Sequence, residues 1–190
     1  MVTYLLPTII FSVFSILILL IYYLKNDISV ENMKEFLGLF FILGGISLII
    51  IITIFPFPID GNEIDFMLSN DLGLKHSWIP LQTVYESVKE IIQGRYGVFF
   101  YQIIGNILLF IPLGIGVTLY LSNNKKYFRK VFFIILITTI SMEALQFIFG
   151  FLLRYNYRST DVDDIILNTI GGLIGYYIIS QMNKKKELLN

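Results

Sequence analysis

The chain of 190 residues has no cysteine and a single histidine, His76. Without cysteine there can be no disulfide bonds, no thiolate catalysis and no cysteine-ligated metal, and one histidine cannot build a histidine-rich metal site. Charged residues are also scarce, at 15% of the chain, against about 25% in a soluble domain. The formal net charge is zero, so the total charge indicates neither a nucleic-acid-binding surface nor a polybasic membrane anchor.

Apolar residues make up 56% of the chain, and the mean hydropathy is +0.75. Five apolar runs approach or exceed the roughly 18 residues that a membrane-spanning helix needs. We therefore predict an all-α polytopic membrane protein with about five transmembrane helices, forming a single membrane domain over residues 1–190. The five predicted spans are Thr3–Leu24, Phe36–Phe55, Val98–Leu121, Lys130–Gly150 and Asp164–Gln181.

The distribution of basic residues predicts how the chain is oriented in the cell membrane. With five spans the two termini lie on opposite faces, and cytoplasmic loops carry an excess of Lys and Arg. Nine basic residues fall on one face: Lys25, Lys34, Lys125, Lys126, Arg129, Lys130, Lys184, Lys185 and Lys186. Five fall on the other: Lys75, Lys89, Arg95, Arg154 and Arg158. This count places the N-terminus outside and the C-terminus in the cytoplasm.

A segment of about 40 residues, Pro56–Gly97, joins the second and third spans on the predicted outer face, and it is longer than a simple connection needs. Pro80 is suited to start a helix within it. The apolar residues that recur there at helical spacing are Leu81, Val84, Tyr85, Val88, Ile91 and Ile92. We expect an amphipathic helix lying flat at the outer interface with Trp78 as its anchor; a short helix packed on the bundle is the alternative.

Polar side chains inside the last three spans mark the candidate site, because an amide or carboxyl group is costly in lipid unless it has partners. They are Asn106, Glu143, Gln146 and Asn168, with Asp161, Asp163 and Asp164 close by. The first four lie within about 12 Å of the predicted outer ends of their helices, judged from the helical rise. Since lipid-facing positions would reject these groups, we expect them to converge around a cleft open to the outside.

The backbone near these residues favours such a cleft. Pro112, inside the third predicted span, leaves a carbonyl without its usual donor, and Gly114 softens the same region, so we expect a kink there. Gly171 and Gly175 form a small-xxx-small pattern that permits close helix contact in the fifth span. Asp163 or Asp164 is suited to cap the start of that span.

Each polar group also has a purely structural interpretation. Glu143 could be an acid, a base or a hydrogen-bond donor, or a strut that fixes helix register through Asn106, Asn168 or an arginine. The amides could bridge helices. The three aspartates could cap a helix, or hold a divalent cation together with Glu143. Arg158 could bind an anionic headgroup or pair with those acids.

Four short motifs occur in order in the second half of the chain. They are WIPL at Trp78–Leu81, NILLFIPLG at Asn106–Gly114, EALQ at Glu143–Gln146 and RSTDVDDIILNTIGG at Arg158–Gly172. Together they resemble the VanZ-like family over residues 78–176, whereas residues 1–55 carry no recognised motif. The positions that the resemblance singles out are Asn106, Pro112, Gly114, Glu143, Gln146, Arg158, Asp161, Asp164, Asn168 and Gly171.

The VanZ-like family takes its name from a protein associated with low-level resistance to teicoplanin, a lipid-tailed glycopeptide, in Gram-positive bacteria. The resemblance implies a role in the cell envelope. Three hypotheses follow: a cleft that binds a membrane lipid, a cell-wall precursor or a lipoglycopeptide; a membrane-embedded enzyme with Glu143 as general acid or base; and a scaffold of an envelope complex. We expect membrane partners rather than nucleic acid.

Overall fold

The structure, a computed structural model, describes residues 4–26, 29–97, 99–121 and 127–187. Its elements are α1 (Leu5–Lys25), α2 (Val30–Ile54), α3 (Gly61–Ser69), α4 (Gln82–Ile92), the π-helix η1 (Phe99–Ile104), α5 (Gly105–Leu121), α6 (Phe128–Leu153) and α7 (Val162–Glu187). Five stretches are long and apolar enough to cross a membrane: Leu5–Lys25, Asn32–Ile54, Phe99–Leu121, Phe128–Leu153 and Val162–Lys184. The all-α polytopic architecture is thereby confirmed. Thr3, Val98, Lys125 and Lys126, used in the sequence predictions, lie outside the described residues.

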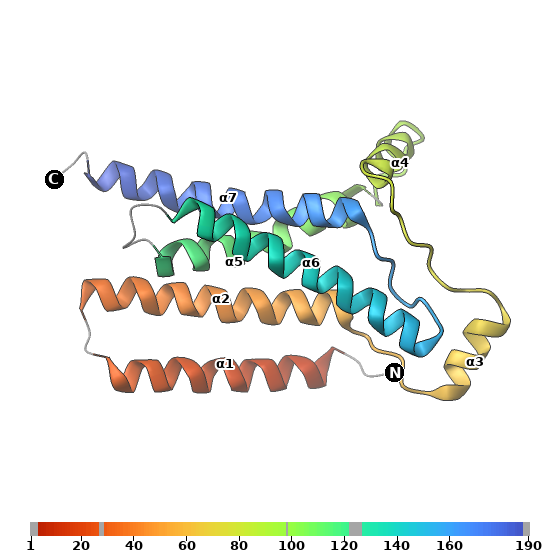
Figure 1. The fold of residues 1–190 in the computed structure, drawn as a ribbon, viewed down its shortest axis with the longest axis horizontal. Coiled ribbons are helices and arrows are strands. Elements are labelled where there is room, and N and C mark those ends of the chain that lie inside the picture. The colour runs from red at the N-terminus through yellow and green to blue at the C-terminus, as the bar shows by residue number, and fades with distance from the viewer. Residues whose placement is uncertain (1–3, 27–28, 98, 122–126, 188–190) are drawn as a thin grey trace.

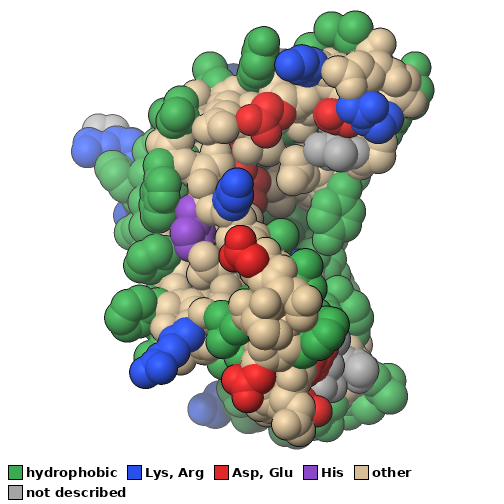
Figure 2. All heavy atoms as spheres, turned by 90° about the vertical axis from the view of Figure 1, so that its right-hand side faces the viewer, with side chains coloured by type: hydrophobic (Ala, Val, Ile, Leu, Met, Phe, Trp, Pro, Cys, Tyr) green, Lys and Arg blue, Asp and Glu red, His purple; other side chains and the backbone are tan. Residues whose placement is uncertain are grey.

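The five long helices run side by side along the longest axis of the molecule (Figure 1). One end of this bundle carries residues 55–97 and 154–161, with α3 and α4, and is called the loop end below. Helices α1 and α7 begin at the loop end, and α7 finishes at the opposite end (Figure 1). Seen end-on, the loop end has charged side chains over its middle and hydrophobic side chains around its rim (Figure 2).

Helix α5 lies between α2 and α7 and packs closely on both. Glycines allow these approaches: a Cβ on Gly171 would lie 2.1 Å from the Ile107 carbonyl oxygen, and one on Gly175 would lie 2.4 Å from that of Ile111. Gly114 is equally close to the backbone of Gly172 across the same interface. The small-xxx-small pattern of the fifth span is therefore the surface on which α7 meets α5.

Apolar side chains from α2, α5 and α6 form the core of the bundle, where Ile49, Phe110, Leu113, Val131 and Ile135 are almost fully buried. Helix α1 contributes little to it, because it packs mainly on α2 and most of its side chains are exposed. Pro112 lies inside α5, which continues to Leu121. The irregular turn of this span is η1, which precedes Asn106 rather than following it.

The segment between the second and third spans contains two helices where the sequence predicts one. Helix α4 matches the predicted amphipathic helix, and Figure 1 shows it almost end-on, crossing the direction of the long helices. Its small polar residues Thr83 and Ser87 are buried, whereas Leu81, Tyr85, Val88 and Ile92 are exposed. An outward apolar stripe is what a membrane interface would cover, and the interfacial position of α4 remains a prediction.

Helix α3 is the element that sequence reasoning missed. Asp60 caps it, with a carboxylate that accepts from the Asn62 N–H over 3.0 Å, and Glu63 follows in the first turn. An aspartate three residues before a glutamate is a helix-start signal in the sequence. Its apolar pattern is weak because the helix has only nine residues and none of them is buried.

Candidate functional site

Two loop segments pair side by side and fix the start of α7. The Leu74 N–H donates to the Asn156 carbonyl over 2.8 Å, and the Ser77 N–H donates to the Thr160 carbonyl over 3.0 Å. The Val162 N–H returns a bond to the Ser77 carbonyl, also over 3.0 Å. Residues 74–77 and 156–162 thus run together in parallel, although more than 80 positions separate them in the sequence.

Two of the three clustered aspartates cap helices. Asp161 caps α7, since its carboxylate accepts from the Asp163 N–H over 2.8 Å, and it also accepts from the Thr83 hydroxyl of α4. Asp163, with no exposed surface, accepts from the backbone N–H groups of Leu81 and Val84 and so caps α4. The cap of the fifth span is therefore Asp161 rather than Asp163 or Asp164, and Asp163 holds α4 on the bundle.

A cavity of about 490 Å³ opens near the loop end between α2, η1, α5, α6 and α7. The polar residues that line it include all four intramembrane residues singled out from the sequence, together with two charged residues: Asn106, Glu143, Gln146, Asn168, Arg158 and Asp164. Asp161 does not line this cavity. It faces a separate pocket of about 230 Å³ that it shares with Glu143 and Trp78.

Glu143 and Asp164 supply the carboxylates of the large cavity. Glu143 on α6 accepts from the Asp161 N–H over 3.0 Å, at the start of α7, and is only 5% exposed. Asp164, in the first turn of α7, accepts from the Asn106 amide of α5 over 2.5 Å. Neither carboxylate has an ion-pair partner among the described residues.

The two remaining amides of the cavity are bonded on their nitrogen side. The Gln146 amide nitrogen donates to the Thr53 carbonyl near the end of α2 over 3.1 Å, and the Asn168 nitrogen donates to the Thr139 hydroxyl over 3.1 Å. Their oxygens, Gln146 Oε1 and Asn168 Oδ1, are buried and have no hydrogen-bond partner among the described residues. Such unpaired acceptors are rare in folded proteins and are costly to bury.

Arg158 holds the end of α2 rather than the acidic cluster. Its guanidinium donates to the carbonyl of Ile52 over 3.2 Å and to that of Phe55, both left free by the end of the helix. No ion pair between Arg158 and a carboxylate is present in the described part of the chain. A cation at a helix C-terminus also complements the helix dipole.

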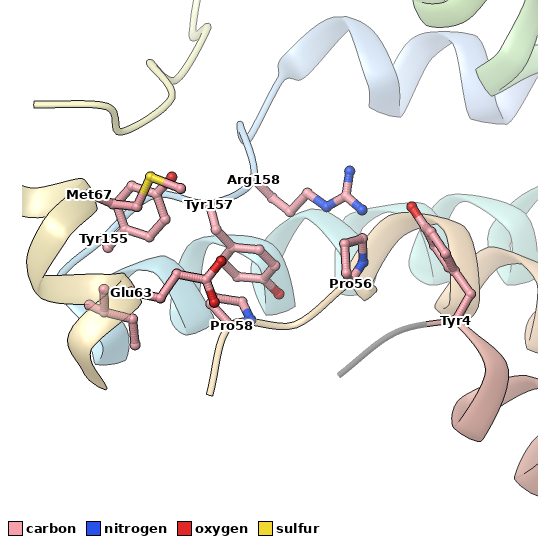
Figure 3. Close-up of a pocket in the computed structure, with 9 residues that line it drawn as sticks. Tyr4, Pro56, Pro58, Glu63, Met67, Tyr155, Tyr157 and Arg158 are labelled. Atoms are coloured by element: carbon pink, nitrogen blue, oxygen red, sulfur yellow. The ribbon is translucent and has the colours of Figure 1, made fainter. Parts of the chain in front are cut away.

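Arg158 lines a second, smaller pocket of about 210 Å³ as well, between the end of α2, α3 and residues 155–158. In Figure 3 its guanidinium points toward Pro56 and Tyr4, with Glu63 and Tyr157 farther along the same pocket. Burial raises the pKa of Tyr157 to about 12, against the opposing charge of Arg158. The Tyr157 hydroxyl has no hydrogen-bond partner among the described residues.

Several residues of the site were not anticipated from the sequence. Thr53 on α2 anchors Gln146, and His76 accepts from the Thr160 N–H over 3.1 Å, which helps to set the loop before α7. The π-helix η1 brings Phe100, Tyr101 and Gln102 to the cavity. The only available signals were an isolated threonine in an apolar run and the single histidine of the chain.

The described residues contain no group of three or more His, Asp or Glu side chains arranged to hold a metal ion. The carboxylates of Asp161 and Asp163 are already occupied by N–H and hydroxyl donors. This leaves Glu143 and Asp164 as the acidic groups available to a ligand in the cavity.

The chain is similar to known proteins over the region that contains this site. The sequence model of VanZ/LLP1 matches residues 40–183, about three quarters of the chain. The chain belongs to the VanZ/LLP1 family. The match reaches farther toward the N-terminus than the four motifs and takes in most of α2, whose last turns line the cavity.

Protein VanZ of Enterococcus faecium is a curated relative of this VanZ/LLP1 protein, 34% identical over 87 residues. That alignment covers 45% of this chain and 48% of the relative, so the chain matches about half the length of Protein VanZ. No solved structure matches the chain.

Proposed function

We propose that this VanZ/LLP1 protein is a non-enzymatic protein of the cell envelope that holds an amphiphile in the cavity between α2, α5, α6 and α7. The amphiphile would be a membrane lipid, a cell-wall precursor or the acyl tail of a lipoglycopeptide, and its capture would lower susceptibility to drugs such as teicoplanin. The observation that carries this proposal is one cavity of about 490 Å³ with an apolar wall and a cluster of polar side chains.

The apolar wall suits an acyl chain. Leu48 and Ile52 of α2 and Leu108 of α5 line the cavity and are also 41%, 41% and 58% exposed on the side of the bundle. Exposed leucine and isoleucine on a spanning helix face lipid, so an acyl chain could enter between α2 and α5 without crossing a polar surface. Its headgroup would then meet the carboxylates and amides of α6 and α7.

The proposed location is the cell membrane, with the N-terminus outside, the C-terminus in the cytoplasm and the loop end facing outward. Its support is the excess of Lys and Arg at the end of the bundle opposite the loop end. In this orientation the cavity opens near the outer leaflet, where cell-wall precursors and a lipid-anchored antibiotic meet the membrane.

A membrane-embedded enzyme acting on an envelope lipid or lipid-linked sugar is the second candidate. The observation that favours it is that two carboxyl groups, the buried Glu143 and the half-buried Asp164, line the same cavity. Two carboxyl groups facing one substrate can divide the roles of general acid and general base. A scaffold role, in contrast, predicts that changes at Glu143 are tolerated and that changes on exposed helix faces are not.

The distinguishing experiment measures susceptibility to teicoplanin and to vancomycin in a sensitive Gram-positive host. The host expresses wild type, Glu143→Gln or Glu143→Ala at matched membrane levels, with Glu86→Gln on the exposed face of α4 as the matched control. A binding cleft predicts selective protection against teicoplanin that survives Glu143→Gln and is lost in Glu143→Ala, because the amide preserves size and hydrogen bonding.

Loss of protection in both Glu143 variants, with Glu86→Gln unaffected, would favour catalysis at Glu143 instead. Absence of protection even from wild type would separate this chain from glycopeptide resistance. The proposal of an amphiphile-binding cavity would then depend on direct binding measurements.

A further inference from the structure

Three amide groups around the large cavity have their hydrogen-bond donors occupied. The amide nitrogens of Asn106, Gln146 and Asn168 donate to Asp164, to the Thr53 carbonyl and to Thr139. The Thr53 carbonyl can only accept, so it requires the nitrogen of Gln146 on its side and turns the amide oxygen away. The nitrogens of these three amides are therefore not available to a ligand.

Acceptors, in contrast, remain unpaired. Gln146 Oε1 and Asn168 Oδ1 belong to side chains that are 7% and 3% exposed, and neither atom has a partner among the described residues. The carboxylates of Glu143 and Asp164 each accept one bond, through Oε2 and Oδ1 respectively, and each has a second oxygen free to accept. The cavity thus presents unpaired acceptors and two carboxyl groups at its polar end.

We propose that the amphiphile held in this cavity carries a primary ammonium group in its headgroup, bound by Glu143, Asp164 and the Gln146 amide oxygen. This inference rests on the proposed amphiphile-binding function and names the chemical class of the ligand. A primary ammonium offers three N–H donors and a positive charge, which matches two carboxylates and an unpaired amide oxygen. An acceptor-only anion would meet repulsion at the same place.

The position of Arg158 is consistent with a headgroup that also carries a phosphate. Arg158 lines the cavity, and one guanidinium nitrogen, Nη2, donates to both carbonyls at the end of α2. The other N–H groups of Arg158 have no partner among the described residues and could donate to a phosphate oxygen. A zwitterionic aminophospholipid would therefore match both the acidic residues and the arginine.

The test compares headgroups on one protein. Purified full-length protein in detergent is titrated with phosphatidylethanolamine, N-acetyl-phosphatidylethanolamine, phosphatidylcholine and phosphatidylglycerol of identical acyl chains, and bound lipid is counted by native mass spectrometry. Phosphatidylcholine keeps the positive charge but has no N–H to donate. We expect phosphatidylethanolamine to bind about tenfold tighter than the other three, since charge-assisted hydrogen bonds are lost in each. Soluble phosphoethanolamine is added as a competitor to distinguish the two sources of the amine. Displacement of the bound lipid would show that the free amine is recognised by itself, and no displacement would show that the lipid headgroup is recognised only with its acyl chains.

Variants of the cavity residues test whether the headgroup preference arises in this cavity. Glu143→Gln and Asp164→Asn should reduce the preference for phosphatidylethanolamine several-fold while lipid is still bound through its acyl chains, and Glu86→Gln should leave the preference unchanged. Equal binding of phosphatidylethanolamine and its N-acetyl form by wild type would overturn this inference while leaving amphiphile binding intact. No saturable binding of any of the four lipids would contradict the proposed function with a membrane lipid as the amphiphile. The wild-type comparison decides even if a variant fails to fold.

Discussion

Adding one methyl group to Gly171 should separate α7 from α5. In Gly171→Ala the new Cβ would lie 2.1 Å from the Ile107 carbonyl oxygen, where ordinary contacts begin at 3.4 Å. Backbone atoms cannot swing aside as a side chain can, so the two helices must move apart by about 1 Å against a close-packed interface. Overpacking of this kind costs about 1–3 kcal/mol.

Gly44→Ala is the matched control for this substitution. Gly44 lies in the exposed part of α2 and has nothing within 4 Å of the position where a Cβ would be built. Both substitutions gain about 1 kcal/mol of helix propensity, so the gain cancels when the two variants are compared. What remains is the packing cost at Gly171.

Thermal unfolding in detergent, followed by the loss of the monodisperse peak in size-exclusion chromatography, measures this difference. For a chain of this length, 1 kcal/mol corresponds to a shift of about 2–4 °C in Tm. Gly171→Ala should therefore unfold several degrees below Gly44→Ala. Identical Tm values for the two variants would refute the close contact between α5 and α7.

Three further predictions concern the loop end. Asp163→Ala should release α4, because two N–H groups at the start of that helix lose their buried acceptor, which costs about 1–3 kcal/mol for each group. Limited proteolysis should then cut within residues 78–92. Unchanged protection of this segment would contradict the capping role of Asp163. Arg158→Gln should loosen the end of α2 and lower Tm, as charge-assisted bonds worth about 1.5–3 kcal/mol are lost, whereas an unchanged Tm would show that these bonds carry no stability. Burial raises the pKa of Tyr157 to about 12 in the folded protein, so the unfolded chain loses the hydroxyl proton first and stability falls as pH rises from about 10 toward 12. Tyr157→Phe should therefore lose less stability than wild type between pH 9 and pH 11. Equal losses of stability in the two proteins would argue against a buried hydroxyl.

Much of the site could be predicted from the cost of placing polar groups in lipid. Asn106, Glu143, Gln146 and Asn168 stood out because each interrupts an apolar run, and helical spacing placed Glu143 and Gln146 on one face. Those residues line one cavity in the structure. The helix ends were also predicted within about six residues, the largest differences being at the start of α2 and the end of α7, because hydropathy over a whole span averages out local errors.

The division of work among the aspartates could not be predicted in the same way. Asp161, Asp163 and Asp164 are neighbours with the same side chain, and their roles depend on α4, which lies about 80 positions away in the sequence. Arg158 likewise binds the end of α2 across more than 100 positions. Local spacing carries no information about such contacts, because they depend on how the loops pair after the helices have assembled.

The measurement that tests the central claim most directly is photo-crosslinking of an acyl chain to the protein in a bilayer. A phospholipid with a diazirine near the middle of one chain is reconstituted with the protein and irradiated, and the labelled residues are mapped by mass spectrometry. The account predicts labelling concentrated on Leu48, Ile52 and Leu108, and competed by excess unlabelled lipid. Labelling spread evenly over exposed residues away from the cavity, such as Ile137 and Phe151, and insensitive to competitor would contradict an amphiphile-binding cavity.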